Sequence, residues 1–134
     1  MEVLASRIIL RPRDFENTLS FYRDRLRLGI FREYPGGVVF FAGQSLIEVA
    51  GHGQAGGRST ADGRAGGRST AGATILLQVR DVEAARTEIE AAGVEIVRPP
   101  QTEPWGLTEM WIADPDGTRI VVVEVPPDHP QRRG

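Results

Sequence analysis

The stretches IILRPRDFE (Ile8–Glu16) and ILLQVRDVE (Ile75–Glu83) are two copies of one pattern, and the offset of 67 residues between equivalent positions is half of the 134-residue chain. In each copy apolar residues alternate with others, as a half-buried strand requires. An aspartate follows, Asp14 or Asp81, whose carboxylate favours the first position of a helix because it can accept hydrogen bonds from free backbone N–H groups. The sequence therefore predicts a strand followed by a helix, twice.

The elements that follow extend this duplication. Apolar residues recur at helical spacing after each aspartate, as Leu19, Tyr22 and Leu26 in the first copy. The second helix is expected to end at Gly93. Three β-rich runs then follow each helix, which predicts an α+β protein made of two βαβββ modules. These runs cover residues 29–34, 37–43, 45–51, 94–99, 107–114 and 118–125.

A second, shorter repeat separates the modules. AGGRSTADGRAGGRSTAG (Ala55–Gly72) has no large apolar side chain to bury, which is typical of a linker. A phosphate-binding loop is the alternative, using Arg58, Arg64 and Arg68, but such a loop has a lysine and leads from a strand into a helix, whereas here a strand follows. We expect the first module at 1–52, the linker at 53–72, the second module at 73–126 and a tail at 127–134.

Composition excludes several classes of function. The chain is 40% hydrophobic and 25% charged, as in ordinary globular proteins, and its net charge of −2 predicts neither a nucleic-acid nor a membrane partner. It has no cysteine, so disulfides, thiolate nucleophiles and sulfur-ligated metals are excluded. Neither a signal peptide nor a membrane span is predicted, and we expect a cytoplasmic protein.

Two stretches carry a resemblance to a known family. RPRDFENTLSFYRDRLRLG (11–29) and EPWGLTEMWIADPDGTRIVVVEV (103–125), together with the paired βαβββ modules, resemble the vicinal oxygen chelate superfamily of glyoxalase I, extradiol dioxygenases, fosfomycin-modifying enzymes and bleomycin resistance proteins. Asp-Pro-Asp-Gly supplies a tight turn into the last strand, and Pro-Trp-Gly resembles the bleomycin resistance branch in particular. The resemblance implies a curved eight-stranded cup, commonly completed across a homodimer, with the ligand inside the cup.

Enzymes of this superfamily hold a divalent metal on the first and last strands of each module. The resemblance puts the usual His or Gln of the first strands at Arg7 and Thr74, and the usual Glu of the last strand at Val121. A guanidinium stays protonated and threonine is a weak donor, so neither is a good ligand. Glu48 suits a metal, although an alternative alignment puts Ile47 at its position. We therefore expect no metal and no cofactor.

The remaining polar and aromatic residues suit ligand binding. Strand alternation puts Arg7, Ile9 and Arg11 on one face, and Thr74, Leu76 and Gln78 on another. His52 and His129 lie at the linker and in the tail and are expected to be exposed. Flat aromatic walls with few polar groups favour a planar ligand. The expected ligand-binding residues are Arg7, Tyr34, Phe40, Glu48, Thr74, Trp105, Met110 and Trp111, of which Phe40 and Trp111 are alternatively core residues.

The sequence thus predicts a homodimeric, metal-free protein that binds and sequesters a small aromatic molecule such as an antibiotic. The alternative is a metal-dependent lyase or dioxygenase of the same superfamily. In that case the metal-ligating residues would lie one position away from those assigned above. A third possibility is an enzyme that has lost its metal and uses Arg7 or Glu48 as acid or base.

Overall fold

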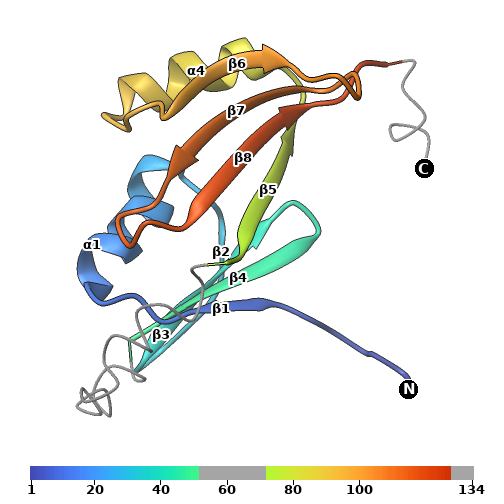
Figure 1. Cartoon of the computed structure of the whole chain (residues 1–134). Helices are drawn as coiled ribbons and strands as arrows, with labels where there is room; N and C mark the ends of the chain where they lie inside the picture. Colours follow the sequence, from blue (N-terminus) through green and yellow to red (C-terminus); the bar gives the residue numbers. More distant parts are fainter. Residues whose placement is uncertain (52–71, 128–134) are drawn as a thin grey trace. The chain divides into compact units, whose positions relative to one another are not determined.

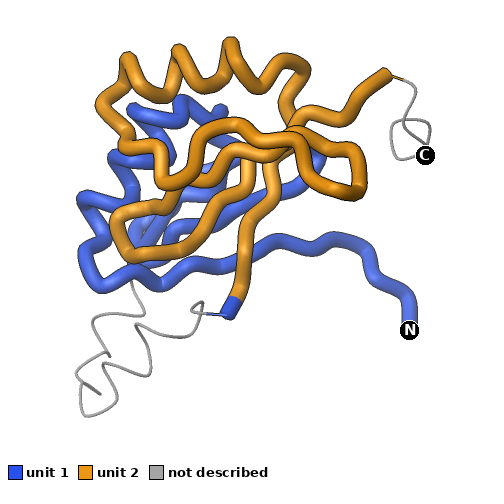
Figure 2. The backbone as a smooth tube through the Cα atoms, turned by 45° about the horizontal axis from the view of Figure 1, so that its top comes forward, with its two compact units in different colours: residues 1–72 blue, residues 73–134 orange. Residues whose placement is uncertain are grey.

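The computed structural model describes residues 1–51 and 72–127, which fall into two compact units, residues 1–72 and 73–134 (Figure 2). Each unit has the element order strand, helix and three strands (Figure 1). The predicted α+β class and the two βαβββ modules are confirmed. The elements of the first unit are β1 (Ile8–Leu10), α1 (Phe15–Ser20), a π-helical turn η1 (Phe21–Arg25), β2 (Ile30–Tyr34), β3 (Gly37–Ala42) and β4 (Ser45–Ala50). Those of the second are β5 (Thr74–Val79), α4 (Val82–Ala91), β6 (Arg98–Thr102), β7 (Thr108–Ala113) and β8 (Arg119–Glu124).

Each unit contains its own four-stranded sheet. The strand orders are β1-β4-β3-β2 and β5-β8-β7-β6, and in each sheet the first strand pairs in parallel with the last. Ile8 pairs with Ile47, and Ile75 pairs with Ile120. The two sheets are therefore equivalent in register, and Glu48 in the first corresponds to Val121 in the second.

Both helices begin as the repeat predicts. The Asp14 carboxylate accepts a hydrogen bond from the Asn17 N–H, and the Asp81 carboxylate accepts from the N–H groups of Glu83 and Ala84. The first helix differs from the expected uniform helix, because after Ser20 it continues as the π-helical turn η1.

One predicted strand is displaced. The run expected at 94–99 forms β6 only from Arg98. Val94 is tied to the end of α4 instead, because its N–H donates to the Ile89 carbonyl, and its side chain is buried. β6 contains Pro99 and Pro100, which lack a backbone donor; it tolerates them because it is an edge strand.

The helix of each unit covers one face of its sheet. In the first unit the Tyr22 ring of η1 lies 6.3 Å from the Phe40 ring, and Phe40 pairs with Ile47 on β4. In the second unit the Glu124 carboxylate accepts a hydrogen bond from the first N–H of α4, that of Val82. We call the other face of each sheet, turned away from the helix of its own unit, the open face.

Three sequence predictions concern residues outside the described part of the chain. They are the linker, apart from Gly72, the tail, apart from Pro127, and the positions of the two histidines, His52 and His129. Within residues 1–51 and 72–127, no helix is long and apolar enough to cross a membrane.

Candidate functional site

The open face of the first sheet holds a buried carboxylate. Glu48 is only 4% exposed and pairs with Val39 on β3 and Ile9 on β1, whereas Ile47 belongs to the helix-covered face with Phe40. The alternative register, with Ile47 on the open face, is therefore wrong for this sheet. A carboxylate at such a position requires partners, because burial of an isolated charge is costly.

Two side chains provide those partners. Arg7, just before β1, places its Nε 2.8 Å from Oε1 of Glu48, and the Tyr34 hydroxyl on β2 donates a short hydrogen bond to Oε2. The Arg7 contact is ionic and lacks hydrogen-bond geometry, so Oε1 accepts no hydrogen bond from any described residue. Arg32 lies over the Tyr34 ring, with its guanidinium carbon 5.8 Å from the ring centre. We call Arg7, Arg32, Tyr34 and Glu48 the Tyr34 cluster.

A glycine makes room for the tyrosine. Tyr34 pairs with Gly37 on β3, and a Cβ added to Gly37 would lie 2.6 Å from the Tyr34 hydroxyl and 2.5 Å from the Val49 carbonyl oxygen. The tyrosine side chain therefore crosses β3 over Gly37 to reach Glu48 on β4. Burial, followed by the hydrogen bond to Glu48, raises the pKa of Tyr34 above the ordinary value of a tyrosine.

The open face of the second sheet is built around a tryptophan. The guanidinium carbons of Arg98 on β6 and Arg119 on β8 lie 4.0 and 4.5 Å from the centre of the Trp111 ring on β7. Arg98 also forms an ion pair with Glu103. Trp111 packs against the buried cluster of Leu107, Val121, Val123 and Val125.

One carboxylate joins both tryptophans of the chain. Glu109 accepts a hydrogen bond of 3.1 Å from the Trp105 indole and one of 3.4 Å from the Trp111 indole. Trp105 remains 59% exposed, whereas Trp111 is half-buried beneath its arginines. The exposed Trp105 ring is therefore the one that offers an aromatic surface to a ligand.

The predicted site residues divide accordingly. Arg7, Tyr34 and Glu48 meet in the Tyr34 cluster, while Phe40 is fully buried on the helix-covered face. That position favours the alternative that Phe40 is a core residue over its assignment to the ligand-binding face, because its ring packs against Tyr22 of the helix.

In the second unit, Thr74 and Trp111 share the open face, and Glu109 ties Trp105 to it. Met110 is fully buried and pairs with Val122 on the other face, so its assignment is corrected too: one residue before Trp111, it points to the opposite side of the strand.

Sequence reasoning missed four polar residues of these faces. Glu109 and Arg32 stand two positions before Trp111 and Tyr34, so strand alternation alone would have found them. Arg98 and Arg119 reach Trp111 from neighbouring strands, and the irregular register after Arg98 hides that contact from the sequence.

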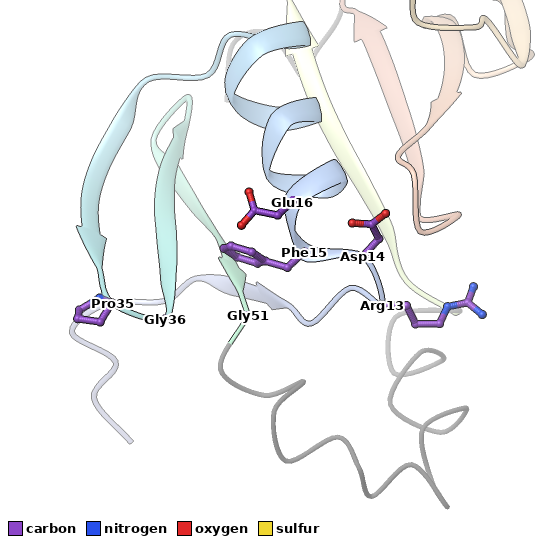
Figure 3. A pocket seen from close by; sticks show the side chains of 7 residues that line it. All are labelled: Arg13, Asp14, Phe15, Glu16, Pro35, Gly36 and Gly51. Atoms are coloured by element: carbon purple, nitrogen blue, oxygen red, sulfur yellow. The ribbon is translucent and has the colours of Figure 1, made fainter.

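A separate hollow of about 700 Å³ lies at the start of α1 (Figure 3). It contains none of the predicted site residues. Asp14 in its wall is occupied in capping the helix, and the Phe15 ring lies so close to Gly51 that a Cβ there would clash at 2.8 Å. The hollow ends at the last residue described before the linker. Its lining residues are Arg13, Asp14, Phe15, Glu16, Pro35, Gly36 and Gly51.

The family model of the glyoxalase/bleomycin resistance protein/dioxygenase superfamily matches residues 5–122 of this chain. The chain belongs to this superfamily. No curated protein matches the chain. A solved protein of unknown function from Agrobacterium tumefaciens str. C58 is 31% identical, with 94% of this chain and 95% of that one covered and a TM-score of 0.67.

Two solved structures with a named activity share the superfamily fold at lower identity. The bleomycin resistance determinant encoded on the transposon Tn5 is 22% identical, covering 92% of this chain and 98% of its own, with a TM-score of 0.65. Lactoylglutathione lyase from Agrobacterium tumefaciens is 18% identical, covering 92% and 96%, with a TM-score of 0.64. At these identities the likeness concerns the fold.

The metal of the superfamily's enzymes does not fit the residues of this member. Glu48, the one carboxylate at a position where the resemblance puts a ligand, is engaged by a guanidinium and a phenol. Thr74 and Val121 occupy the corresponding places of the second sheet. Within the described residues no group of three His, Cys, Asp or Glu side chains is placed to hold a metal ion. A divalent cation would have to displace Arg7 and would then find a single carboxylate.

Proposed function

We propose that this superfamily member binds a small planar organic molecule without a metal ion and protects by sequestration, as a drug-binding resistance protein. The observation that carries this proposal is the state of Glu48: the carboxylate that would serve a metal is neutralised by Arg7 and hydrogen-bonded by Tyr34. Sequestration requires only affinity, because protein in excess of the dissociation constant lowers the free concentration of the ligand.

The open face of the second sheet supports an aromatic ligand. Trp105 is anchored through its indole N–H to Glu109 and is 59% exposed, so it is held in place before a ligand arrives. A ring fixed in this way loses little conformational entropy on binding. Leu76, 53% exposed, adds apolar surface to the same face.

We further propose that the protein works as a homodimer. Large apolar side chains on the open faces are exposed, including Ile9 at 38%, Phe41 at 46% and Leu76 at 53%. Soluble monomers seldom expose large apolar patches to water, and a second copy would cover these side chains. Light scattering at micromolar concentration is expected to give twice the 14.7 kDa mass of one chain. A stable monomer would refute the dimer while leaving ligand binding open.

Tryptophan fluorescence tests the proposed function directly, because both tryptophans of the chain lie beside Glu109. Purified protein is titrated with planar aromatic natural products such as flavonoids and anthraquinones, before and after exhaustive treatment with EDTA, and its metal content is measured. We expect saturable quenching that EDTA does not change. Turnover of a ligand that EDTA abolishes and a divalent ion restores would refute sequestration and establish a metal-dependent enzyme.

A further inference from the structure

We propose that the ligand carries an oxyanion and that Arg7 and Arg32, on the open face of the first sheet, bind it. This inference rests on the proposed function and specifies the chemical class of its ligand. It begins from a charge imbalance, because the Tyr34 cluster has two guanidinium groups and one carboxylate.

Arg7 is oriented for such a role. Its Nε side faces the buried Glu48, which fixes the direction of the side chain, yet its guanidinium makes no hydrogen bond within residues 1–51 and 72–127. The side chain is 35% exposed. A guanidinium carries five N–H donors in a planar fork that matches a carboxylate or a phosphate. Glu48 thus acts as a positioning residue that presents the fork to the open face.

Arg32 approaches the Tyr34 side chain from β2, the edge strand opposite β1 in the first sheet. It lies over the Tyr34 ring, and no carboxylate in the described part of the chain pairs with it. Both guanidiniums act electrostatically on the Tyr34 hydroxyl, where they oppose the rise of its pKa. Arg7 contacts the Glu48 carboxylate to which the Tyr34 hydroxyl donates, and Arg32 lies over the Tyr34 ring, so the two positive charges flank one point of the sheet.

The hydrogen-bonding capacity of the cluster favours an anion over a neutral or cationic group. The proton of Tyr34 is committed to Glu48, and the carboxylate of Glu48 is buried. What remains for a ligand is a set of N–H donors with an excess of positive charge. Ile9 on the same face is partly exposed, and Val39 lies beside Glu48, so the oxyanion is expected on an apolar body.

Four probes with one naphthalene ring test this inference by isothermal titration calorimetry of the whole chain. They are 1-naphthoate, 1-naphthyl phosphate, 1-naphthalenemethanol and 1-naphthylmethylamine. We expect the naphthoate or the phosphate to bind at least about tenfold more tightly than the alcohol, the amine to bind most weakly, and added salt to weaken only the anions. Which of the two anions binds more tightly distinguishes a carboxylate ligand from a phosphate ligand.

Variants locate the subsite. Arg7→Gln and Arg32→Gln are each expected to lower the affinity for the preferred anion about tenfold and to leave the alcohol unchanged. Arg25→Gln is the matched control, because it removes the same charge from an exposed position on η1. Arg32→Gln keeps the test valid if Arg7→Gln fails to fold, since Arg32 makes no ion pair among the described residues.

The outcomes separate the two proposals. If the alcohol or the amine binds as tightly as the anions, or if Arg25→Gln weakens the anions as much as the other variants do, the oxyanion subsite is refuted and aromatic binding stands. If none of the four probes binds at millimolar concentration, the subsite is refuted and the proposed function loses support as well.

Discussion

The Nε atom of Arg7 lies 2.8 Å from Oε1 of Glu48, so the residue that precedes β1 neutralises a buried carboxylate on β4, the strand paired with β1. The pair unites both proposals. It occupies the carboxylate that a metal would need, and it orients a guanidinium toward the open face. Its energetic importance is directly measurable.

Arg7→Gln is expected to lower the free energy of unfolding by about 1–2 kcal/mol at pH 7. The Glu48 side chain is 6% exposed and would lose its counter-charge, but Arg7 is one-third exposed, so screening keeps the effect below that of a fully buried pair. Urea denaturation measures the change. The double variant Arg7→Gln/Glu48→Gln should regain most of the loss. An unchanged unfolding midpoint in the single variant would show that solvent already neutralises Glu48.

Gly37→Ala is expected to destabilise the first unit by about 2 kcal/mol or more, because its Cβ would overlap the Tyr34 hydroxyl and the Val49 carbonyl oxygen, and the carbonyl belongs to backbone. Gly29→Ala is the matched control: its Cβ would make an ordinary contact, 3.7 Å from the Phe41 ring, and its effect should stay within about 0.5 kcal/mol. Thermal unfolding compares the two. Equal melting temperatures would contradict the close passage of Tyr34 over β3.

Stability is expected to fall as pH rises above about 10, the usual pKa of tyrosine. Burial and the hydrogen bond to Glu48 raise the pKa of Tyr34 in the folded chain, so between the unfolded and folded pKa values the folded state retains a proton that the unfolded state has lost. Tyr34→Phe should flatten this decline. Urea denaturation from pH 8 to pH 11 measures it, and an equally steep decline in the variant would assign the effect to other groups.

Trp105→Ala is expected to weaken binding of an aromatic ligand by about 1–3 kcal/mol, the usual loss when a stacking ring is removed. The fold should persist because the side chain is largely exposed. Trp105→Phe keeps a ring but loses the hydrogen bond to Glu109. Its affinity for the ligand should therefore lie between that of Trp105→Ala and that of the wild type. Calorimetric titration with the ligand identified by fluorescence provides the comparison. Undiminished affinity in Trp105→Ala would remove this ring from the site.

The sequence was informative where one strand or one helix decides the structure. The 67-residue offset between Asp14 and Asp81 predicts both modules, since each aspartate caps its helix through local hydrogen bonds. Contacts between neighbouring strands were harder to predict from the sequence. Whether Glu48 or Ile47 faces away from the helix depends on the register between β3 and β4, which a single sequence leaves open.

The uncertainty about which face of a strand each residue occupies also explains why Phe40 and Met110 were assigned to the ligand-binding face. Phe40 and Met110 each have a neighbour on the open face, Val39 and Trp111, and a shift of one residue exchanges the two sides of a strand. The role of Gly37 was invisible because it depends on a side chain that crosses the strand from Tyr34.

The parallel pairing of β1 with β4, and of β5 with β8, has a consequence for assembly and ancestry. The first and last strands of each half are neighbours, so in the described part of the chain every strand finds its hydrogen-bonding partners within its own half. Among the described strands, no ladder of backbone hydrogen bonds has to be broken to separate the halves. Two such chains could exchange halves, and an ancestral chain of half the length could have formed the same two sheets by pairing with a copy of itself, before duplication placed both on one polypeptide.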